Sequence, residues 1–414
     1  MKKSHFQTSV YIIFSFFLFS QCTEKKTDVN EDKELEFLFE ADGVHLEEPF
    51  LNLSPDGKLF FSWIEKSDTT NKLKYAAWQD STWSEPILIA KGQDWFVNWA
   101  DYPQLASFDN GSMMAVFLQK SGPGTFAYDV MMTFSENGTE WTKPTVLHDD
   151  GSKTEHGFVS LSPFGQEMLI TWLDGRNTGG NGHHENHQHS HQGQMSIRAA
   201  LVDNNGNKLN EWELDNRVCD CCQTGSAITE EGPIVVFRDR SESEIRDIGL
   251  VRWIDSSWTE TEPLFMDLWE IAACPVNGPR IVAFENQVAV AWYTAAKGNP
   301  EVKLVFSQDN GASFSSPVRI DLGKTIGRIA LCYLEKDKVM VTWMEEVKIF
   351  GRTVSIDGSL GKARELAFTS EKRSSGFPQS VFDGTNLWLA WTDDQSETKK
   401  IRIKRINFSE ENIK

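Results

Sequence analysis

The sequence predicts an all-β protein, a seven-bladed β-propeller whose blades are four-stranded antiparallel sheets. The first observation is an apolar run that ends in a large aromatic residue and recurs seven times, at spacings of 48 to 65 residues. The aromatic residues are Trp63, Phe117, Trp172, Phe237, Trp292, Trp343 and Trp391. A repeat of this period with four strands per unit is typical of propeller blades. A six-bladed propeller is the alternative count.

The second observation is another aromatic marker that follows a polar turn in four of the units. It stands at Trp83, Trp141, Trp258 and Phe314. The two markers keep the same phase, which favours one repeated unit over a series of unrelated hairpins. Within residues 217–253, short apolar runs alternate with polar turns, as in an antiparallel meander. We expect the seven aromatic residues to be buried at equivalent positions of the blades.

The N-terminus has the pattern of a secretory signal. Lys2 and Lys3 precede an apolar run that is too short for a comfortable membrane span, and Cys22 follows it. Residues 1–21 resemble a bacterial lipoprotein signal peptide with Cys22 as the lipidation site, although Gln21 stands where a small residue is usual. We therefore expect a lipid-anchored protein of the cell envelope, in the periplasm or at the outer-membrane surface. A plain secreted protein is the alternative.

The rest of the chain fits one domain. Residues 22–34 are charged and without apolar period, which predicts a flexible tether, and residues 35–414 form the propeller. The last unit has only three clear strands, so the alternating stretch 35–40 is expected to complete it and close the ring. Without residues 1–21 the net charge of −19 becomes −21, which disfavours nucleic acid and anionic lipid surfaces. We expect a monomer.

Function is expected on one face of the ring. In an antiparallel meander, the segment that leads into the first strand and the loop that leaves the second strand lie at the same end of the blade. The lead-in segments are residues 45–49, 98–103, 155–157, 219–224, 274–279, 327–328 and 376–378. Turns at the other end are mostly short. The candidate ligand-binding residues on the first face are His45, Glu48, Asn98, Asp101, His156, Asp174, Arg176, Asp239 and Asn277.

A family resemblance supports this fold. Residues 307–314, SQDNGASF, resemble the Asp-box of the sialidase superfamily, and residues 135–141 resemble a shortened copy. The motifs DGRN, CDCCQT, FRDR and CPVNGP resemble bacterial sialidase-like proteins, also called neuraminidase-repeat proteins. The resemblance implies a propeller in which the Asp-box is a structural turn between the third and fourth strands. It also implies, as one function, an exo-acting glycoside hydrolase for acidic sugars.

The chain departs from sialidases at a residue that their chemistry needs. They carry a carboxylate-binding arginine near the start of the first blade, whereas this chain has no arginine before Arg176. We therefore expect no sialidase activity. The candidates for catalysis are Asp101, Tyr102, Arg176, Arg238, Arg240, Arg246 and Arg328. A cluster of arginines would suit a carboxylate or phosphate ligand. The alternative is that they form ion networks with neighbouring acidic residues.

Five cysteines remain beyond Cys22. Cys219, Cys221, Cys222 and Cys274 lie in the lead-in segments of two successive units, so we expect them to converge at the mouth of the channel with Arg176, Arg238 and Asn277. Thiolates there would bind Cu(I) or Zn(II). A disulfide from Cys274 and a redox site are the alternatives. An extended run would let a single site take only two of the first three cysteines. Cys332 is expected to be a buried thiol in a strand.

A histidine-rich insert, Gly179–Gly193, leaves the second strand of the third unit. Its histidines would bind Zn, Cu or Ni weakly, and a solvated loop without a ligand is the alternative. They are His183, His184, His187, His189 and His191. Together these patterns predict a propeller that binds a ligand, an acidic glycan or a metal ion, at the channel mouth. The other two hypotheses are the glycoside hydrolase and a thiolate metal or redox site.

Overall fold

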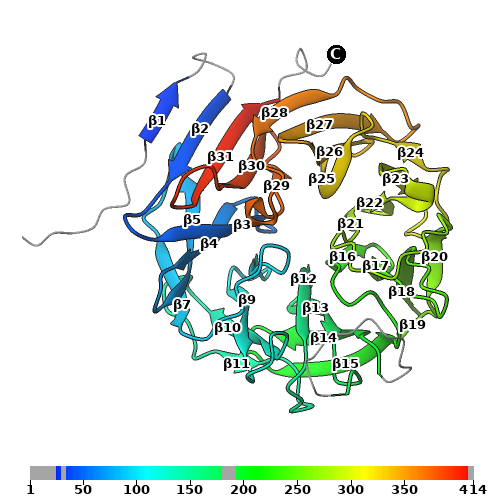
Figure 1. The fold of residues 1–414 in the computed structure, drawn as a ribbon, viewed down its shortest axis with the longest axis horizontal. Helices are drawn as coiled ribbons and strands as arrows, with labels where there is room; N and C mark the ends of the chain where they lie inside the picture. Colours follow the sequence, from blue (N-terminus) through cyan, green and yellow to red (C-terminus); the bar gives the residue numbers. More distant parts are fainter. Residues whose placement is uncertain (1–24, 29–33, 180–192, 409–414) are drawn as a thin grey trace, which may run out of the picture.

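The protein is a seven-bladed β-propeller in a computed structural model that describes residues 25–28, 34–179 and 193–408. Seven antiparallel sheets stand around a central axis (Figure 1). The prediction of seven blades is confirmed, and the six-bladed alternative is wrong. Two short 3₁₀ turns, η1 (Ala296–Gly298) and η2 (Arg373–Ser375), interrupt the strands. None of the helices in these ranges has the length and apolar character needed to traverse a lipid bilayer.

The strands of the first four blades follow one another along the chain. Blade 1 contains β3 (His45–Leu53), β4 (Leu59–Lys66), β5 (Asn71–Gln79), β6 (Thr82–Trp83) and β7 (Ile87–Gly92). Blade 2 contains β8 (Gln104–Ser107), β9 (Met113–Lys120), β10 (Tyr128–Ser135) and β11 (Thr145–Val146). Blade 3 contains β12 (His156–Phe164), β13 (Glu167–Asp174), β14 (Ser196–Asp203) and β15 (Lys208–Asp215). Blade 4 contains β16 (Gly225–Thr229), β17 (Gly232–Arg238), β18 (Ile248–Ile254), β19 (Ser257–Trp258) and β20 (Glu262–Phe265).

The last three blades complete the ring. Blade 5 contains β21 (Arg280–Phe284), β22 (Gln287–Thr294), β23 (Glu301–Ser307) and β24 (Val318–Arg319). Blade 6 contains β25 (Thr325–Glu335), β26 (Lys338–Glu345), β27 (Lys348–Ser355) and β28 (Arg364–Phe368). Blade 7 contains β29 (Gln379–Phe382), β30 (Asn386–Asp393), β31 (Lys400–Asn407), β2 (Glu34–Phe39) and β1 (Lys25–Asp28).

The two ends of the propeller meet in blade 7. Strand β2 pairs antiparallel with β31, from Glu34 opposite Ile406 to Phe39 opposite Ile401. The predicted closure by the N-terminal strand is therefore present, and it covers an edge that would otherwise stay open. Strand β1 pairs in turn with β2, so part of the predicted tether is a strand. The outer edge of β2 supplies the backbone N–H and C=O groups with which β1 pairs. The tether sequence itself has no apolar period that would predict this strand.

The first strand of each blade lies at the axis. Each first strand contacts the first strand of the next blade, and the series β3, β8, β12, β16, β21, β25, β29 returns to β3. The seven marker aromatics lie on the second strands and are at most 2% exposed, as predicted. Trp172, for example, packs with Val116 of blade 2 and Val202 of its own blade. These aromatics fill the wedges between adjacent blades, which is why the unit needs one at this position.

The Asp-box-like segment forms a turn between β23 and β24. Oδ1 of Asp309 accepts hydrogen bonds from Oγ of Ser307, at 2.7 Å, and from the backbone N–H of Ser313, at 2.9 Å. Gly311 adopts a positive φ of 81° there, which costs glycine little. Because this turn joins the third and fourth strands, it lies at the end of the blade opposite the lead-in segments.

Side chains close the centre of the ring. The ring of Tyr102, before β8, lies 6.0 Å from that of Phe50 on β3 and 6.3 Å from that of Phe377, before β29. Arg280 at the start of β21 donates a 2.7 Å hydrogen bond from Nη2 to the hydroxyl of Tyr102. These residues come from blades 1, 2, 5 and 7, so their contacts cross the axis. A ligand on the lead-in face would therefore meet a floor of packed aromatic rings.

Candidate functional site

Three cysteines come together where the chain leads into β16. The Sγ atoms of Cys219, Cys221 and Cys222 all lie within 4.8 Å of one another. Residues Asp220 and Cys221 form a turn, so the segment is not extended. The extended run that would let a single site take only two of these three cysteines is not present, because the turn brings the third sulfur to the same side.

Cys274 joins this group from the next blade. Its thiol interacts with that of Cys221 and is the exposed member, whereas Cys219 and Cys222 are buried. We call these four residues the thiol cluster. All five cysteines in the described ranges are free, and the disulfide alternative is not formed. Cys332 lies buried in β25, and burial raises the pKa of its thiol to about 12.

The surroundings of Cys219 favour the thiolate form of its sulfur. Burial raises the pKa of Cys219, but hydrogen bonds from the other two thiols and the charge of Arg246 outweigh it, so the pKa lies well below its usual range. Nη1 of Arg246 lies 3.3 Å from the Sγ of Cys219. Burial and the neighbouring thiolate raise the pKa of Cys222 instead. A thiolate is the form of cysteine that attacks electrophiles and ligates metals.

The arginines around the thiol cluster are occupied by other protein groups. Arg240 pairs with Glu244 at 2.8 Å and with Asp220 at 3.1 Å, and Arg246 pairs with Glu244 at 2.9 Å. Arg238 and Arg328 are buried and donate to backbone carbonyl groups. The arrangement matches the alternative of ion and hydrogen-bond networks. The guanidinium groups of these four arginines are therefore not open to bind the carboxylate of a ligand.

Asn277 and Arg176 were both predicted to lie near the cysteines, but the structure places them in different surroundings. The backbone carbonyl of Asn277 accepts hydrogen bonds from Nε and Nη2 of Arg238, and the charge of that arginine acts on Cys222. Arg176 lies instead in blade 3, where it pairs with Asp174 at 2.7 Å and with Glu211 at 3.2 Å. The expected gathering of Arg176 with the cysteines is not found, because its own neighbouring acids hold it.

Beside the thiol cluster lies a second group, which we call the acid cluster: Asp101, Tyr128, Glu155 and Glu48. The Tyr128 hydroxyl donates to Glu155 Oε1 at 2.7 Å and approaches Oδ2 of Asp101 at 3.3 Å. The backbone N–H of Phe158 donates to Oδ1 of Asp101 at 2.7 Å. The charges of Asp220 and Cys274 act on Glu155, which joins the two clusters.

Burial raises the pKa values of the three carboxyl groups of the acid cluster. It raises the pKa of Asp101 to about 7 and the pKa values of Glu48 and Glu155 well above their usual range. Both carboxyl oxygens of Glu48 are buried without a hydrogen-bond partner. The backbone at Gly157 packs closely against Asp101, since a Cβ added to Gly157 would lie 2.1 Å from Asp101 Oδ2. Buried acids with raised pKa values are a common feature of functional sites.

A pH dependence of stability should follow from Asp101. Its pKa is about 7 in the folded protein against an ordinary 3.8. The folded state therefore holds the proton more tightly, and the free energy of unfolding falls as the pH rises from about 4 to about 7, by up to about 4 kcal/mol. In urea titrations at pH 4 and pH 7, Asp101→Asn should lose the share that Asp101 contributes, while Glu48 and Glu155, whose pKa values are also raised, should keep theirs. The exposed Asp109→Asn should keep the whole dependence, and equal behaviour of the two variants would contradict the assignment.

The remaining predicted residues are distributed around the ring. Tyr102 does not pair with Asp101 but with Arg280, and it packs in the centre. His45 accepts a hydrogen bond from the backbone N–H of Lys399, and Asn98 accepts one from that of Ala100. Asn98 therefore stabilises its own loop, whereas His45 joins the start of β3 to the loop before β31 of blade 7.

Three more predicted residues lie in blades 3 and 4. Burial raises the pKa of Asp239 to about 6. His156 and Asp174 belong to a separate group between blades 2 and 3. Cys22, the signal segment 1–21 and the histidines 183, 184, 187, 189 and 191 lie outside the described residues.

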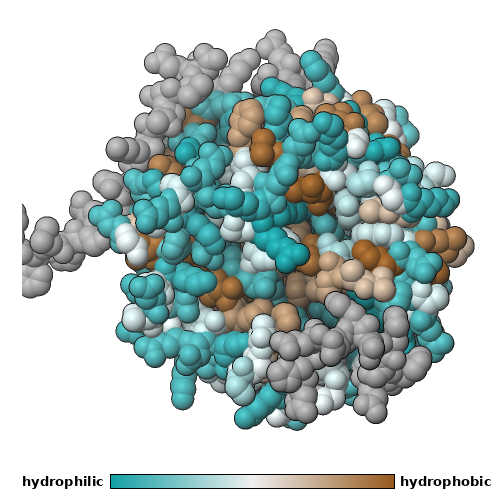
Figure 2. Space-filling view, viewed as in Figure 1, coloured by the Kyte–Doolittle hydropathy of each residue, from teal (hydrophilic) through white to brown (hydrophobic). Residues whose placement is uncertain are grey.

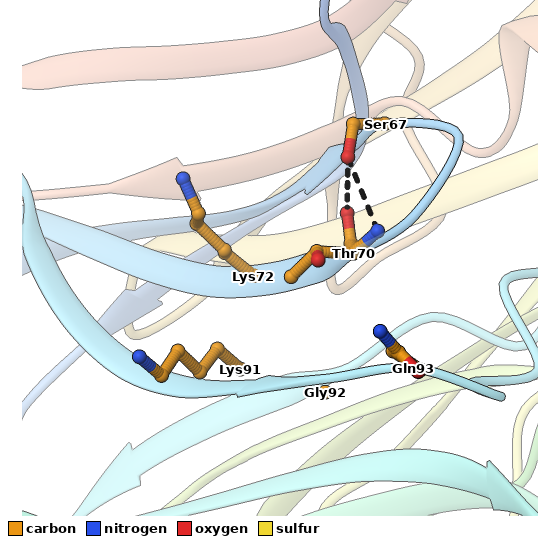
Figure 3. A pocket seen from close by; sticks show the side chains of 6 residues that line it. All are labelled: Ser67, Thr70, Lys72, Lys91, Gly92 and Gln93. Atoms are coloured by element: carbon orange, nitrogen blue, oxygen red, sulfur yellow. Dashed lines mark hydrogen bonds between the residues drawn. The ribbon is translucent and has the colours of Figure 1, made fainter.

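The surface also has a polar pocket in blade 1 (Figure 3). It is lined by Ser67, Thr70, Lys72, Lys91, Gly92 and Gln93. Ser67 Oγ donates to the carbonyl of Thr70 at 2.9 Å and fixes the loop between β4 and β5. None of the candidate site residues lines it. Figure 2 shows hydrophilic side chains over most of the face seen there, with smaller hydrophobic patches between them.

Comparisons with known proteins agree with the fold. No protein-family model matches the sequence, and a search of curated proteins found no match. Among solved structures, the polysaccharide lyase Uly1 aligns with a TM-score of 0.55 and 10% identity, over 88% of this chain and 90% of its own. A protein of unknown function from Dyadobacter fermentans aligns with a TM-score of 0.52 and 12% identity, over 91% of this chain and 99% of its own. At such identities the likeness is one of fold.

Proposed function

We propose that the protein binds a thiophilic metal ion, Cu(I) or Zn(II), in the thiol cluster. The observation that carries the proposal is the approach of three Sγ atoms to within 4.8 Å of one another, with Cys274 beside them. Thiolates select soft and borderline ions, and Zn(II) takes up to four of them. Arg246 donates to Cys219 Sγ at 3.3 Å and pairs with Glu244, so it stabilises the thiolate form that a metal ion needs.

The burial pattern suits an ion that enters from solvent. Cys219 and Cys222 are buried and would form the inner ligands, while the exposed Cys274 would close the site. The ion would neutralise the negative charge of the Cys219 thiolate. Its binding must displace protons from the remaining thiols, so the affinity should rise with pH.

Metal titration tests the function directly. The reduced protein, handled without oxygen, should take up one Cu(I) or Zn(II) per chain against a competing chelator. Uptake should disappear after alkylation of the cysteines. A variant with the five histidines of residues 183–191 changed to asparagine should keep the tight site. Tight uptake that survives alkylation, or no uptake at all, would reject the proposal.

Glycan processing is the second candidate function, and the acid cluster favours it. Glycoside hydrolysis needs a carboxylic acid that stays protonated near neutral pH, and the pKa of Asp101, about 7, suits that role. The polysaccharide lyase Uly1 shares the fold. Tyr128 is fully buried, however, so a substrate would reach the hydroxyl only after the rim opens.

A substrate screen should separate this candidate from the sialidase type. We expect no release of sialic acid from a fluorogenic sialoside, because Arg238, Arg240 and Arg246 are held by other groups and the first blade has no arginine. Turnover of any acidic polysaccharide should instead depend on Asp101, so Asp101→Asn should lose at least about 100-fold in rate. Sialic acid release that Arg240→Ala abolishes would show that the arginines do bind substrate.

A further inference from the structure

The thiol cluster contains an inner and an outer pair of sulfurs. The inner pair is Cys219 and Cys222, which are 1% and 2% exposed and whose Sγ atoms lie 3.1 Å apart. The outer pair is Cys221, which is partly buried, and the exposed Cys274, whose thiol interacts with that of Cys221. The Sγ atoms of Cys219 and Cys221 lie 4.0 Å apart. The four sulfurs therefore form a continuous row from the surface to the interior.

The backbone holds the inner pair in place. The N–H of Cys219 donates to the carbonyl of Arg238, at the end of β17, at 2.9 Å. The chain turns at residues 220–221, and beyond the turn the side chain of Gln223 makes hydrogen bonds to the lead-in segments of blades 2 and 5, at 2.7 and 2.9 Å. The segment is thus fixed on both sides of the turn. The approach of the two inner sulfurs follows from this anchoring.

Two thiols in this arrangement can be oxidised to a disulfide. A disulfide bond is about 2.05 Å long, so the inner sulfurs need to move together by only about 1 Å. The spacing Cys-x-x-Cys of Cys219 and Cys222 also occurs in disulfide oxidoreductases. Because both members are buried, an oxidant from solvent meets Cys274 first.

We propose that the thiol cluster is a redox-active site that exchanges with the disulfides of small thiols. The outer pair receives the disulfide at the surface, and the inner pair holds it in the interior. This activity uses the sulfurs of the proposed metal site, but it does not depend on metal binding, because it belongs to the metal-free protein.

Each step of the exchange moves one disulfide bond to the next sulfur. The Cys274 thiolate attacks a small-molecule disulfide, RSSR, and one RS⁻ leaves. The Cys221 thiolate attacks the sulfur of Cys274, and the second RS⁻ leaves. The Cys219 thiolate then attacks Cys221 and releases Cys274, and the Cys222 thiolate attacks Cys219 and releases Cys221. In total, Cys219 and Cys222 lose two electrons and two protons, and RSSR becomes two RSH.

Arg246 favours the return of the inner pair to the reduced form. Its Nη1 lies 3.3 Å from the Sγ of Cys219, and its Nη2 pairs with Glu244 at 2.9 Å. The positive charge stabilises the thiolate that reduction sets free. A disulfide whose reduced form is stabilised in this way is reduced more easily. We therefore expect a reversible disulfide that small thiols reduce again.

Mixtures of reduced and oxidised glutathione test the proposal. The protein is first freed of metal with a chelator and fully reduced without oxygen. After an acid quench, alkylation under denaturing conditions and fragmentation of the peptides show which cysteines carry the label. With oxidised glutathione, the label should be absent from Cys219 and Cys222 and present on Cys221 and Cys274. An excess of reduced glutathione should restore it at all four.

Cys274→Ser separates the entry of the disulfide from its final position. Oxidation should be at least about tenfold slower in this variant, because the buried sulfurs lose their contact with the oxidant. The final share of the Cys219–Cys222 disulfide should stay as in the parent protein, whereas a merely structural role of Cys274 would change neither value or both. Cys332→Ser is the control and should match the parent in rate and final share.

Two results would overturn the proposal: no disulfide between Cys219 and Cys222 in oxidised glutathione, or oxidation of Cys274→Ser at the rate of the parent. Neither depends on the outcome of the metal titration. A protein that binds Cu(I) but forms no inner disulfide would keep the proposed function and reject this inference. A protein that forms the disulfide but binds no ion would do the reverse.

Discussion

Cys222→Ser should weaken Cu(I) binding by at least about 100-fold, equivalent to about 3 kcal/mol. Cys222 is buried, and its Sγ lies 3.1 Å from that of Cys219, so it belongs to the inner part of the thiol cluster. A serine hydroxyl is a hard ligand that stays protonated and cannot replace a thiolate for a soft ion. Competition with a chromophoric Cu(I) chelator under anaerobic conditions measures the loss.

The position of each cysteine should determine the size of its effect. Cys274→Ser changes the exposed ligand, so its loss should be smaller, about tenfold. Cys332→Ser is the matched control, because Cys332 is also a buried thiol but lies within β25 and outside the cluster. Its variant should bind Cu(I) as the parent does. Equal losses for Cys222→Ser and Cys332→Ser would indicate general destabilisation in place of a metal site.

Arg238→Met should lower the free energy of unfolding by about 4 kcal/mol. The guanidinium is 2% exposed and donates to the carbonyls of Arg246, Asn277 and Tyr293, at 2.6 to 3.1 Å. It also lies 4.9 Å from the centre of the Trp269 ring. Methionine fills much of the volume but removes the donor to three carbonyls, and a buried polar group left without a partner costs about 1–3 kcal/mol.

Arg240→Met is the comparison for this effect. Arg240 is a neighbour in the same loop, but its side chain is 25% exposed and pairs with carboxylates at the surface. Such pairs contribute about 1 kcal/mol or less, so the unfolding midpoint in guanidinium chloride should barely move. If Arg238→Met were as mild as Arg240→Met, the guanidinium would not be what joins blades 4 and 5 at the rim.

Local patterns were enough to predict the architecture. The aromatic marker at Trp172 or Trp292 identifies the second strand of a blade because every wedge between blades must be filled by a large side chain. The alternating stretch 35–40 predicts the closing strand because an incomplete last blade has an edge to cover. Both conclusions depend only on residues near one another in sequence and on a repeated geometry.

The contacts within the site could not be predicted from local sequence patterns. Asp101 and Tyr102 are neighbours in the sequence, but in the structure Asp101 contacts Tyr128 and the backbone of Phe158. Phe158 itself has a positive φ of 54°, and Glu48 has one of 56°. No side-chain pattern signals such a backbone in residues other than glycine. The lead-in segments therefore take shapes that only their contacts with neighbouring blades can stabilise.

The contacts of His148 with His156 and Asp129 were missed for a topological reason. Asp129 begins a third strand and His148 follows a fourth strand, and both positions share the face of the lead-in segments. The repeat pattern identifies first-strand starts and second-strand exits on that face, but not the starts of third strands or the ends of fourth strands. The run His148-Asp149-Asp150 directly after a strand was the signal that would have drawn attention to it.

The sequence by itself determined the number of blades, the strand order, the closure by the N-terminal strand and the face on which chemistry-bearing residues collect. These follow from periodicity, because each blade repeats one pattern of burial. Only the tertiary structure decided which residues of that face touch. It turned the chain at Asp220 so that a third sulfur joins the thiol cluster, and it held Arg176 among the acids of blade 3. The physical reason is that such contacts join different blades or depend on a single turn, and neither leaves a period in the chain.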